Sequence, residues 1–277
     1  MFDALYCYKD NSVKFFSVFE FKNLSDAHIE KYRYHLTCPA CGGKAYFRRD
    51  SIDGKQACFG SRYHKVDCAE FAPSPRKTEE QKQVAEVETL ILEVDELLID
   101  FSAPIVRESS KKSAPPSEVQ APKESVKKES KVSVNKQTLK KLLVSLLRGS
   151  SLASSDLWIY TSEKHKWRAK NLFVNVNDAK PTDNGAPRMY WGTIATIDKT
   201  LNWLNPAEER SVAIPIGRYR DLFLSYFKVQ EQCDVEGAGF IMFAKCIESK
   251  DKKRKFLQLW GDDLQYFHLS KAQDDSV

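Results

Sequence analysis

Hydrophobic and polar residues alternate along the first part of the chain in a way that predicts a β-hairpin. The segments 2–8 and 13–21 are apolar and rich in aromatic residues, and a short polar turn separates them. After the hairpin, Ser25 and Asp26 are suited to cap a short helix over residues 26–34. The first part of the chain is therefore expected to hold one hairpin and one helix before the cysteine-rich region.

Two further segments have helical patterns. Residues 77–90 are polar and compatible with a helix, whereas the apolar segment 89–101 fits either a strand or a helix. Residues 137–148 predict an amphipathic helix that ends at Gly149, because five leucines fall on one helical face. These are Leu139, Leu142, Leu143, Leu146 and Leu147.

Beyond this helix the pattern changes to that of strands, beginning at 157–161. The order that follows (three strands, a helix, two strands) is that of an OB-fold, a five-stranded barrel. We expect the helix, residues 217–227, to plug the barrel with Leu222, Phe223 and Phe227 facing inward. The five barrel strands are expected at 168–177, 188–198, 210–216, 239–248 and 254–260.

A segment of low hydrophobicity separates the two patterned parts. Residues 106–135 contain no aromatic residue and are rich in Ser, Lys, Glu and Pro, so they bury too little apolar surface to offset the entropy of ordering. Residues 107–141 hold ten Lys or Arg and four Glu, a charge of +6 in a chain of net charge +5. This charge favours a polyanionic partner without supplying specificity. The sequence predicts a domain at 1–105, a disordered basic linker at 106–135, a domain at 136–272 and a tail at 273–277.

The composition excludes several classes of protein. Of 277 residues, 42% are hydrophobic and 29% charged, as in ordinary soluble proteins. No stretch approaches ~18 consecutive apolar residues, so no transmembrane helix is expected. The N-terminus lacks the basic and apolar regions of a secretory signal. We therefore expect a cytoplasmic protein, in which disulfides are rare and the seven cysteines need another explanation.

The cysteines give the strongest indication of chemistry. Cys38 and Cys41 form a C-x2-C knuckle followed by Gly-Gly, and His64 and Cys68 follow at a spacing of about one helical turn. Three thiolates and one imidazole complete a tetrahedral Zn²⁺ shell, and thiolates suit zinc better than a hard ion. Four protein ligands indicate a structural site that stabilises a unit with a small core. Cys58 is a fifth candidate and the substitute for His64.

The first quarter of the chain resembles a known bacterial module. A hairpin and a helix precede Cys38-Pro-Ala-Cys41, and short strands, Cys58-Phe, His64 and Cys68 follow. This order resembles the N-terminal zinc module of competence-protein-CoiA-like bacterial proteins over residues 2–70, and differs from it where Cys58-Phe replaces a His-Phe pattern. In that family the module can precede a nuclease-like domain. The resemblance implies a bacterial protein with a role in DNA metabolism.

Basic and aromatic residues cluster in both domains. On the expected strands 239–248 and 254–260, an aliphatic face expected in the core alternates with a face that combines aromatic, Lys and Gln residues. Aromatic residues beside Lys or Arg are typical of OB-folds that stack single-stranded bases and neutralise phosphates. The alternative is that the aromatic residues belong to the core and the charged hairpin protects a sheet edge. The candidate nucleic-acid contacts are Arg48, Arg49, Arg62, Lys65, Trp167, Arg188, Trp191, Phe243, Lys245, Lys252, Lys253, Arg254, Phe256 and Trp260.

Evidence for catalysis is weak. The chain lacks a P-loop, a G-x-S-x-G motif and an H-E-x-x-H motif. Asp234, Glu248 and Lys250 match the loose D…E-x-K pattern of metal-dependent nucleases, in which carboxylates hold Mg²⁺ and the Lys assists the attacking water. This pattern is short enough to arise by chance, so the sequence favours a protein that is not an enzyme.

The sequence thus predicts an α+β protein. A small zinc-stabilised N-terminal domain, treble-clef or zinc-ribbon-like, is linked to a mostly β, OB-fold-like barrel. The expected function is that of a bacterial accessory DNA-binding protein. Its barrel binds single-stranded DNA, and its zinc module contacts DNA or a helicase or nuclease partner. Two alternatives stay open: a protein–protein adaptor that touches no nucleic acid, and a metal-dependent nuclease.

Overall fold

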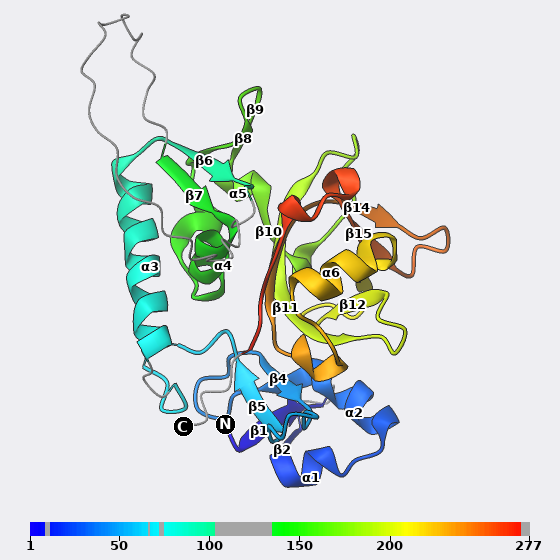
Figure 1. Ribbon diagram of the computed structural model, residues 1–277. Helices are drawn as coiled ribbons and strands as arrows, with labels where there is room; N and C mark the ends of the chain where they lie inside the picture. Colours follow the sequence, from blue (N-terminus) through cyan, green and yellow to red (C-terminus); the bar gives the residue numbers. More distant parts are fainter. Residues whose placement is uncertain (9–11, 66, 72–74, 103–134, 273–277) are drawn as a thin grey trace, which may run out of the picture.

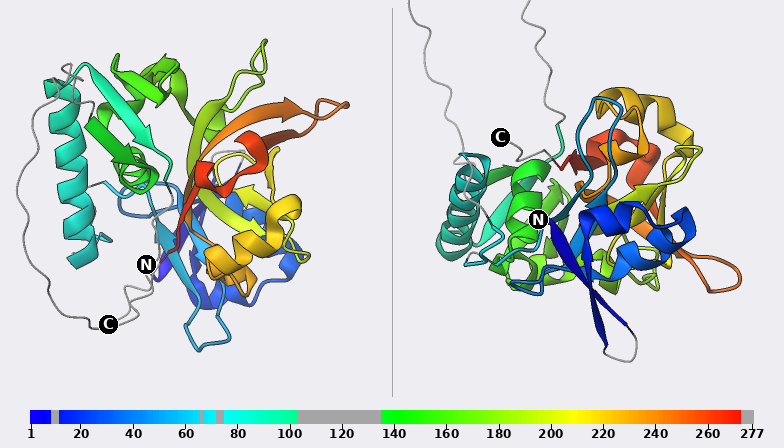
Figure 2. Two further views of the ribbon diagram at one scale, coloured as in Figure 1. Left: turned by 45° about the horizontal axis from the view of Figure 1, so that its top comes forward. Right: turned by 90° about the horizontal axis from the view of Figure 1, so that it is seen from below.

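Three packed units make up the structure (Figure 1). An N-terminal unit lies at the bottom of Figure 1, and above it a middle α/β unit and a C-terminal β-barrel lie side by side. Figure 2 shows helix α3 (Pro75–Glu93) along the side of the molecule away from the barrel. No helix among the residues described is long and apolar enough to cross a membrane. The structure, a computed structural model, describes residues 1–8, 12–65, 67–71, 75–102 and 135–272.

Two small sheets form the N-terminal unit. The predicted hairpin is present as β1 (Asp3–Cys7) and β2 (Val13–Ser17), and β3 (Leu36–Thr37) pairs with the other side of β1. A second sheet pairs β4 (Ala45–Arg48) with β5 (Cys58–Ser61). A cluster of aromatic rings fills the core of the unit, and it includes Tyr6, Phe16, Phe21, Phe47 and Phe59.

Two short helices follow the hairpin. Helix α2 (Asp26–Tyr32) begins at the predicted cap, where the Ser25 hydroxyl accepts a hydrogen bond from the backbone N–H of His28. Helix α1 (Val18–Lys22) begins within the segment 13–21, which was predicted to be a strand throughout. The strand ends at Ser17 because the hydroxyl of this residue caps α1 by accepting from a backbone N–H of its first turn.

A four-stranded sheet and two helices form the middle unit. The strand order is β7-β6-β8-β9, with β6 parallel to both of its neighbours. The five leucines predicted to share one face of helix α4 (Leu139–Leu147) are all buried, together with one face of the sheet and part of α3. The strands are β6 (Glu96–Asp100), β7 (Asn135–Thr138), β8 (Trp158–Ser162) and β9 (His165–Arg168).

The predicted domain boundary near residue 105 falls inside this unit and needs correction. Strand β6 precedes the basic segment and pairs with β7 and β8, which follow it. Helix α3 and strand β6 therefore belong with the C-terminal half of the chain. Segment 106–135 joins two neighbouring strands of one sheet and does not connect two separate domains. Its predicted disorder lies outside the described residues, apart from Asn135, as does the predicted tail at 273–277.

Five strands close the C-terminal barrel. Their order is β11-β12-β13-β15-β14, and β14 pairs back onto β11. Strands β13 and β15 are parallel, and the other neighbours are antiparallel. Helix α6 (Arg220–Tyr226) lies between the third and fourth strands in sequence, as predicted. The strands are β11 (Arg188–Ile197), β12 (Trp203–Pro206), β13 (Val212–Pro215), β14 (Gly239–Glu248) and β15 (Lys255–Leu259).

The prediction of individual barrel strands was wrong in two places. Segment 168–177 holds helix α5 (Ala169–Leu172) and strand β10 (Phe173–Asn175), which flanks β11 outside the closed ring, as β16 (Phe267–Ser270) flanks β14. The barrel begins instead with β11, and its second strand, β12, was missed because it has only four residues. Leu222 of α6 was predicted to face inward but is 61% exposed. Phe223 and Phe227, the other two predicted residues, do pack into the barrel core.

Side chains on β14 and β15 alternate as predicted. The aliphatic face of each strand points into the barrel, where desolvation raises the pKa of the Cys246 thiol to about 11. Cys233, also predicted to be buried, has a pKa raised to about 12, again mainly by desolvation. The inward residues are Phe240, Met242, Ala244, Cys246, Leu257 and Leu259.

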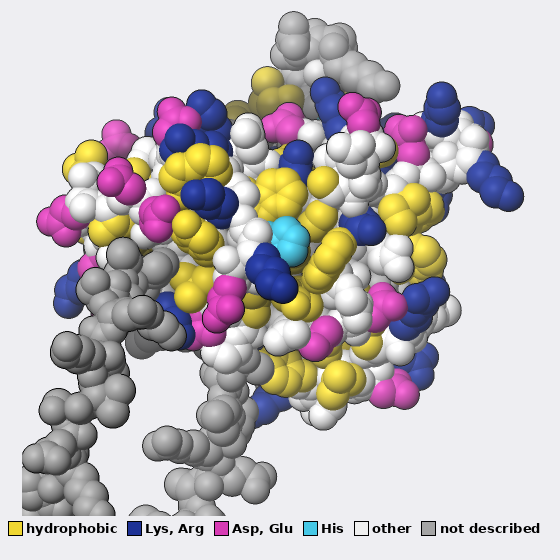
Figure 3. Space-filling view, turned by 90° about the horizontal axis from the view of Figure 1, so that it is seen from above, with side chains coloured by type: hydrophobic (Ala, Val, Ile, Leu, Met, Phe, Trp, Pro, Cys, Tyr) yellow, Lys and Arg dark blue, Asp and Glu magenta, His cyan; other side chains and the backbone are white. Residues whose placement is uncertain are grey.

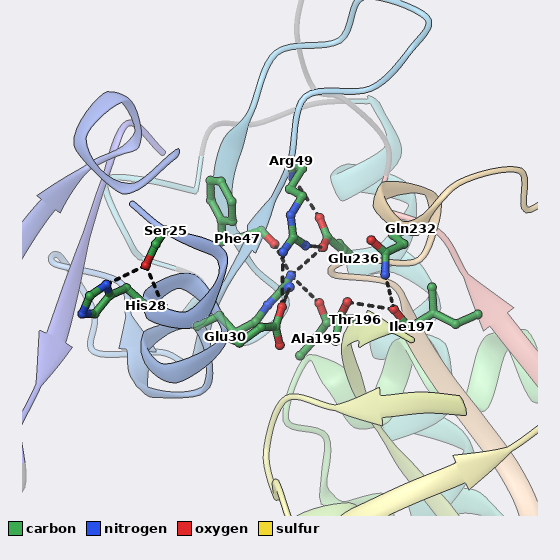
Figure 4. Close-up of polar contacts among 11 residues, drawn as sticks. Ser25, His28, Glu30, Phe47, Arg49, Ala195, Thr196, Ile197, Gln232 and Glu236 are labelled. Atoms are coloured by element: carbon green, nitrogen blue, oxygen red, sulfur yellow. Dashed lines mark hydrogen bonds and ion pairs between the residues drawn. The ribbon is translucent and has the colours of Figure 1, made fainter. Parts of the chain in front are cut away.

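A buried ion cluster joins the N-terminal unit to the barrel. The guanidinium of Arg33, which is 1% exposed, lies 2.8 Å from the fully buried carboxylate of Glu236. It also donates hydrogen bonds to the carbonyl oxygens of Phe47 at 3.1 Å and Ala195 at 2.6 Å. Arg49 binds the same carboxylate through its guanidinium and its backbone N–H (Figure 4). Because each buried charge has a partner and further hydrogen bonds, the cluster favours one orientation of the two units.

Two more side chains complete this junction. Glu30 lies 2.8 Å from Arg33 and 3.2 Å from Arg49. Burial acts to raise the pKa of Glu30, but the two guanidinium groups outweigh it and hold the pKa below its usual range. Arg62 donates to the carbonyl oxygens of Gly237 at 3.0 Å and Ser270 at 2.8 Å, which gives a second connection between the units.

Replacing Glu236 is expected to destabilise the protein strongly. Glu236→Gln leaves Arg33 buried without its central counter-charge, so the free energy of unfolding should fall by about 3–5 kcal/mol. Urea denaturation of the full chain measures this change. Asp262→Asn is the control because it breaks an exposed ion pair with Arg218, and it should cost no more than about 1 kcal/mol. A loss below about 1 kcal/mol in Glu236→Gln would contradict the role of the cluster.

Candidate metal centre and candidate nucleic-acid interface

Three cysteines and one histidine of the N-terminal unit converge on one point. The ligand atoms of Cys38, Cys41, His64 and Cys68 all lie within 4.8 Å of one another. Cys68 Sγ lies 3.3 Å from His64 Nδ1 and 3.8 Å from Cys38 Sγ, and Cys41 Sγ lies 3.5 Å from His64 Nδ1. A tetrahedron with metal–ligand bonds of about 2.1–2.3 Å has edges of roughly 3.4–3.8 Å. The cluster therefore has the size needed to hold a metal ion.

The knuckle that carries the first two ligands is built by a tight turn. Gly42 N–H donates to the carbonyl oxygen of Cys38 at 2.9 Å, and Gly42 has a φ of +71°, which favours glycine. A Cβ on Gly43 would lie 2.5 Å from the carbonyl oxygen of Tyr63 and 3.3 Å from Cys41 Sγ. Glycine at this position therefore lets the knuckle approach the segment that carries His64.

The thiols of the cluster differ in acidity. Burial opposes ionisation of Cys41, yet hydrogen bonds from the backbone of Lys65 and Gly43 hold its pKa below the usual range. Desolvation raises the pKa of Cys68 to about 11, and the neighbouring Cys38 and Cys41 contribute to the rise. Two adjacent thiolates are unfavourable without a cation between them. A bound divalent ion would supply the charge that ionises the second sulfur.

Cys58 stands apart from the cluster. It lies on β5 opposite Arg48 of β4 and lines a cavity of about 600 Å³ beside that strand. The cluster thus consists of the four residues favoured from the sequence, and Cys58 does not substitute for His64.

Aromatic and basic side chains gather on the outer face of the barrel. Trp203 of β12 is 40% exposed, and its ring centroid lies 5.6 Å from that of Phe256 on β15. Ala213 of β13 pairs with Phe256, and its small side chain lets the two rings meet across the strand. On the same sheet, Lys245 lies 5.0 Å over the ring of Trp260, which is 36% exposed. These residues form a continuous outer face on β12, β13, β15 and β14, which we call the barrel face.

The barrel face is bordered by a hollow and a basic loop. Lys245, Gln258 and Trp260 line a cavity of about 450 Å³. At the other end of the face, the β14–β15 turn exposes the predicted contacts Lys252, Lys253 and Arg254. Hydrogen bonds within the turn, among them Arg254 N–H to Ser249 Oγ at 3.0 Å, give it a defined shape. Positive charge therefore lies beside the exposed rings.

The structure places other predicted contacts away from this face. The guanidinium groups of Arg48, Arg49 and Arg62 bind protein oxygens: the Gln56 carbonyl, the Glu236 carboxylate and the carbonyls at the junction. Phe243 is buried beneath Trp260 and Tyr266. Trp167, Arg188 and Trp191 are half-buried between the middle unit and the barrel, and Lys65 is exposed beside the metal cluster.

The nuclease pattern is not assembled. Asp234 and Glu248 lie before and at the end of the ten-residue strand β14, which is about 30 Å long at 3.3 Å per residue. The carboxylate of Asp234 instead accepts hydrogen bonds from the backbone N–H groups of Gln230 and Glu231. The two carboxylates are too far apart to share one metal ion.

No sequence pattern predicts the ion cluster at the junction. Arg33 follows an ordinary short helix and carries no motif. The one available signal is Glu236, a charged residue within the small and apolar sequence Val235-Glu-Gly-Ala-Gly-Phe240. Such a residue is expected to be buried only with a partner, but the sequence does not say which.

Comparison of the chain with protein-family models, with curated proteins and with solved structures finds no match.

Removing a ligand of the cluster is expected to abolish metal binding. The full chain should bind about one Zn²⁺, and Cys38→Ser should reduce its zinc content to near zero because an incomplete thiolate shell binds far more weakly. Cys58→Ser is the matched control and should retain zinc. Metal content after dialysis against a weak chelator measures both. Loss of zinc in Cys58→Ser, or none in the wild-type protein, would contradict the assignment. Acidification should release the metal, since its ligands must be deprotonated.

Proposed function

We propose that this protein binds single-stranded nucleic acid, most directly single-stranded DNA, on the barrel face. The observation that carries the proposal is the pair formed by the exposed Trp203 and the half-buried Phe256 beside the basic β14–β15 turn. Every base has a π-face that stacks on an aromatic ring, and Lys or Arg beside the ring neutralises the phosphates. The site has no catalytic arrangement, so the proposed role is binding without chemistry.

The topology of the barrel supports this assignment. In an OB-fold, oligonucleotides bind on the face of the second and third strands and on the loops between strands 1 and 2 and strands 4 and 5. Here the second and third strands are β12 and β13, and the loop between the fourth and fifth is the basic turn before Lys255. We therefore assign the barrel as an OB-fold whose exposed rings lie where ligands bind in that fold.

The proposed role of the N-terminal unit is to hold a structural zinc ion and to stabilise its own small core. Four ligands leave no open coordination position for catalysis. We keep the assignment of a zinc-ribbon or treble-clef-like module, and the resemblance to CoiA-like bacterial proteins, as part of this proposal, with a role in the bacterial cytoplasm beside a helicase or nuclease. Contact of this unit with DNA receives less support, because Arg48, Arg49 and Arg62 bind protein oxygens.

A protein–protein adaptor is the second candidate function. It is favoured by the solvent face of the hairpin β1–β2, where Val13 is 53% and Phe15 is 66% exposed. Both lie on β2, an edge strand of its sheet. Large exposed apolar patches often mark protein interfaces. The adaptor reading requires no nucleic acid, so a binding titration separates the two functions.

Removing an exposed ring from the barrel face is expected to weaken DNA binding. Trp203→Ala should raise the Kd for a labelled single strand of about ten nucleotides by roughly 10-fold, since one base-stacking contact is worth about 1–3 kcal/mol. Fluorescence anisotropy of the full chain at two salt concentrations measures the Kd. Affinity should fall as salt rises because phosphate contacts release counterions.

Leu92→Ala is the control for this experiment. Leu92 is 86% exposed on α3, which lies along the side of the molecule away from the barrel, and its removal should leave the Kd unchanged. Equal affinities of wild type and Trp203→Ala would remove the barrel face from the proposal. Absence of binding by the wild-type chain would favour the adaptor.

A further inference from the structure

The four-stranded sheet of the middle unit has a second face that is not used in the core. Successive side chains of a strand point to opposite faces, and Leu97, Ile99 and Ile159 are buried against the helices. Their neighbours Trp158 and Tyr160 therefore point to the other side, where both are only half-buried. We call this side the outer sheet face.

Strand pairing places the side chains of the outer sheet face in two rows. One row combines aromatic and basic residues on adjacent strands, because Trp158 of β8 pairs with Arg168 of β9. The second row repeats the arrangement with Tyr160 and Lys166. Lys136 of β7 extends the second row from the opposite edge of the sheet, through the pairing of β7 with β6. The two rings thus lie side by side on β8, with the two cations opposite them on β9, and β6 contributes Glu96 to the first row and Leu98 to the second.

The cations lie directly over the rings. The guanidinium carbon of Arg168 is 4.0 Å from the ring centroid of Trp158. Lys166 Nζ lies 4.6 Å from the same centroid. Lys166 Nζ is 5.7 Å from the ring of Tyr160. Lys166 is exposed, and its flexible side chain can leave the ring to meet a phosphate while a base takes its place. The ring of Tyr160 is held in place by its hydroxyl, which donates to Glu96 of the neighbouring strand β6 at 3.0 Å.

The charge of the surroundings favours a polyanion over a protein partner. Lys136 begins a row that ends in Lys166, and Arg168 follows on β9, whereas the charge of Lys170 is paired with Asp156 at 2.6 Å. The sequence 107–141, which follows β6 and includes β7, carries a charge of +6. Figure 3 looks onto the end of the molecule that holds β8 and β9, and it shows Lys, Arg, Asp and Glu side chains interspersed among hydrophobic ones. Rings beside basic side chains suit a single-stranded nucleic acid.

The outer sheet face is connected to the barrel through β9. The neighbour of Lys166 on this strand, Trp167, points to the other face of the sheet, where the guanidinium carbon of Arg188 lies 5.0 Å from its ring. Arg188 is the first residue of β11, which belongs to the barrel. One hairpin thus contacts the barrel with one side and presents Trp158 and Tyr160 on the other.

We propose that the outer sheet face is a second binding surface for single-stranded nucleic acid, and that one long strand contacts it together with the barrel face. This inference rests on the proposed function of the barrel and adds a site outside it. It predicts that affinity depends on the length of the strand, because an OB-fold alone covers roughly 4–16 nucleotides.

The test compares two lengths of labelled oligothymidine, about 8 and about 30 nucleotides, on the full chain. The double variant Trp158→Ala with Lys166→Ala should raise the Kd for the 30-mer about 10-fold and leave the Kd for the 8-mer unchanged, since the 8-mer is held by the barrel. Unchanged 8-mer binding also shows that the variant is folded. Lys164→Ala is the control. It removes one exposed charge from the turn of the same hairpin and leaves Trp158 and Lys166 in place, so it should change both affinities less than twofold.

Each result separates the two proposals. Equal 30-mer affinity in wild type and double variant would overturn the outer sheet face and leave the barrel proposal intact. A loss for both lengths, with a native circular dichroism spectrum, would place Trp158 and Lys166 in the same site as the barrel face and overturn the idea of a second surface. Failure of wild type to bind either oligonucleotide would overturn both proposals.

Discussion

The buried pair Arg33–Glu236 is the interaction on which the arrangement of the units depends. Burying a guanidinium and a carboxylate costs desolvation energy, and the cost is offset only where both charges are paired and hydrogen-bonded. Here the hydrogen bonds come from the backbone of both the N-terminal unit and the barrel, so they form only in one orientation. The metal cluster and the barrel are thereby held as parts of one body. A flexible pair of domains, as the basic segment had indicated, would not need such a junction.

The same junction limits where a polyanion would bind under the proposed function. The sequence predicts Arg49 and Arg62 as nucleic-acid contacts near the cysteines. In the structure their guanidinium groups bind protein oxygens at the junction. The exposed combinations of ring and cation lie elsewhere: Trp203 and Phe256 near the basic turn of the barrel, and Trp158 with Lys166 on the middle sheet. Both pairs of side chains lie on strands that pack one face into a core and leave the other face available for a ligand. The alternation of side chains makes that double use possible.

Much of the fold and of the metal cluster was predictable because it depends on local patterns. The C-x2-C knuckle, the histidine and the last cysteine identified the cluster, and the five leucines identified α4. Features that depend on distant partners were not predictable. Strand β6 pairs across the basic segment, so its place in the middle sheet cannot be deduced from residues 75–105 alone. Strand β12 is too short to show a period, and Arg33 meets its partner 203 positions later in the chain.

Ultraviolet crosslinking of the full chain to a single-stranded oligothymidine, with the crosslinked peptides mapped by mass spectrometry, tests the central claim most directly. The account predicts crosslinks to peptides that contain Trp203, and to those that contain Phe256 and Trp260, because stacked bases react with the rings that they touch. Crosslinks confined to the N-terminal unit, or a complete absence of crosslinks at saturating protein, would contradict it.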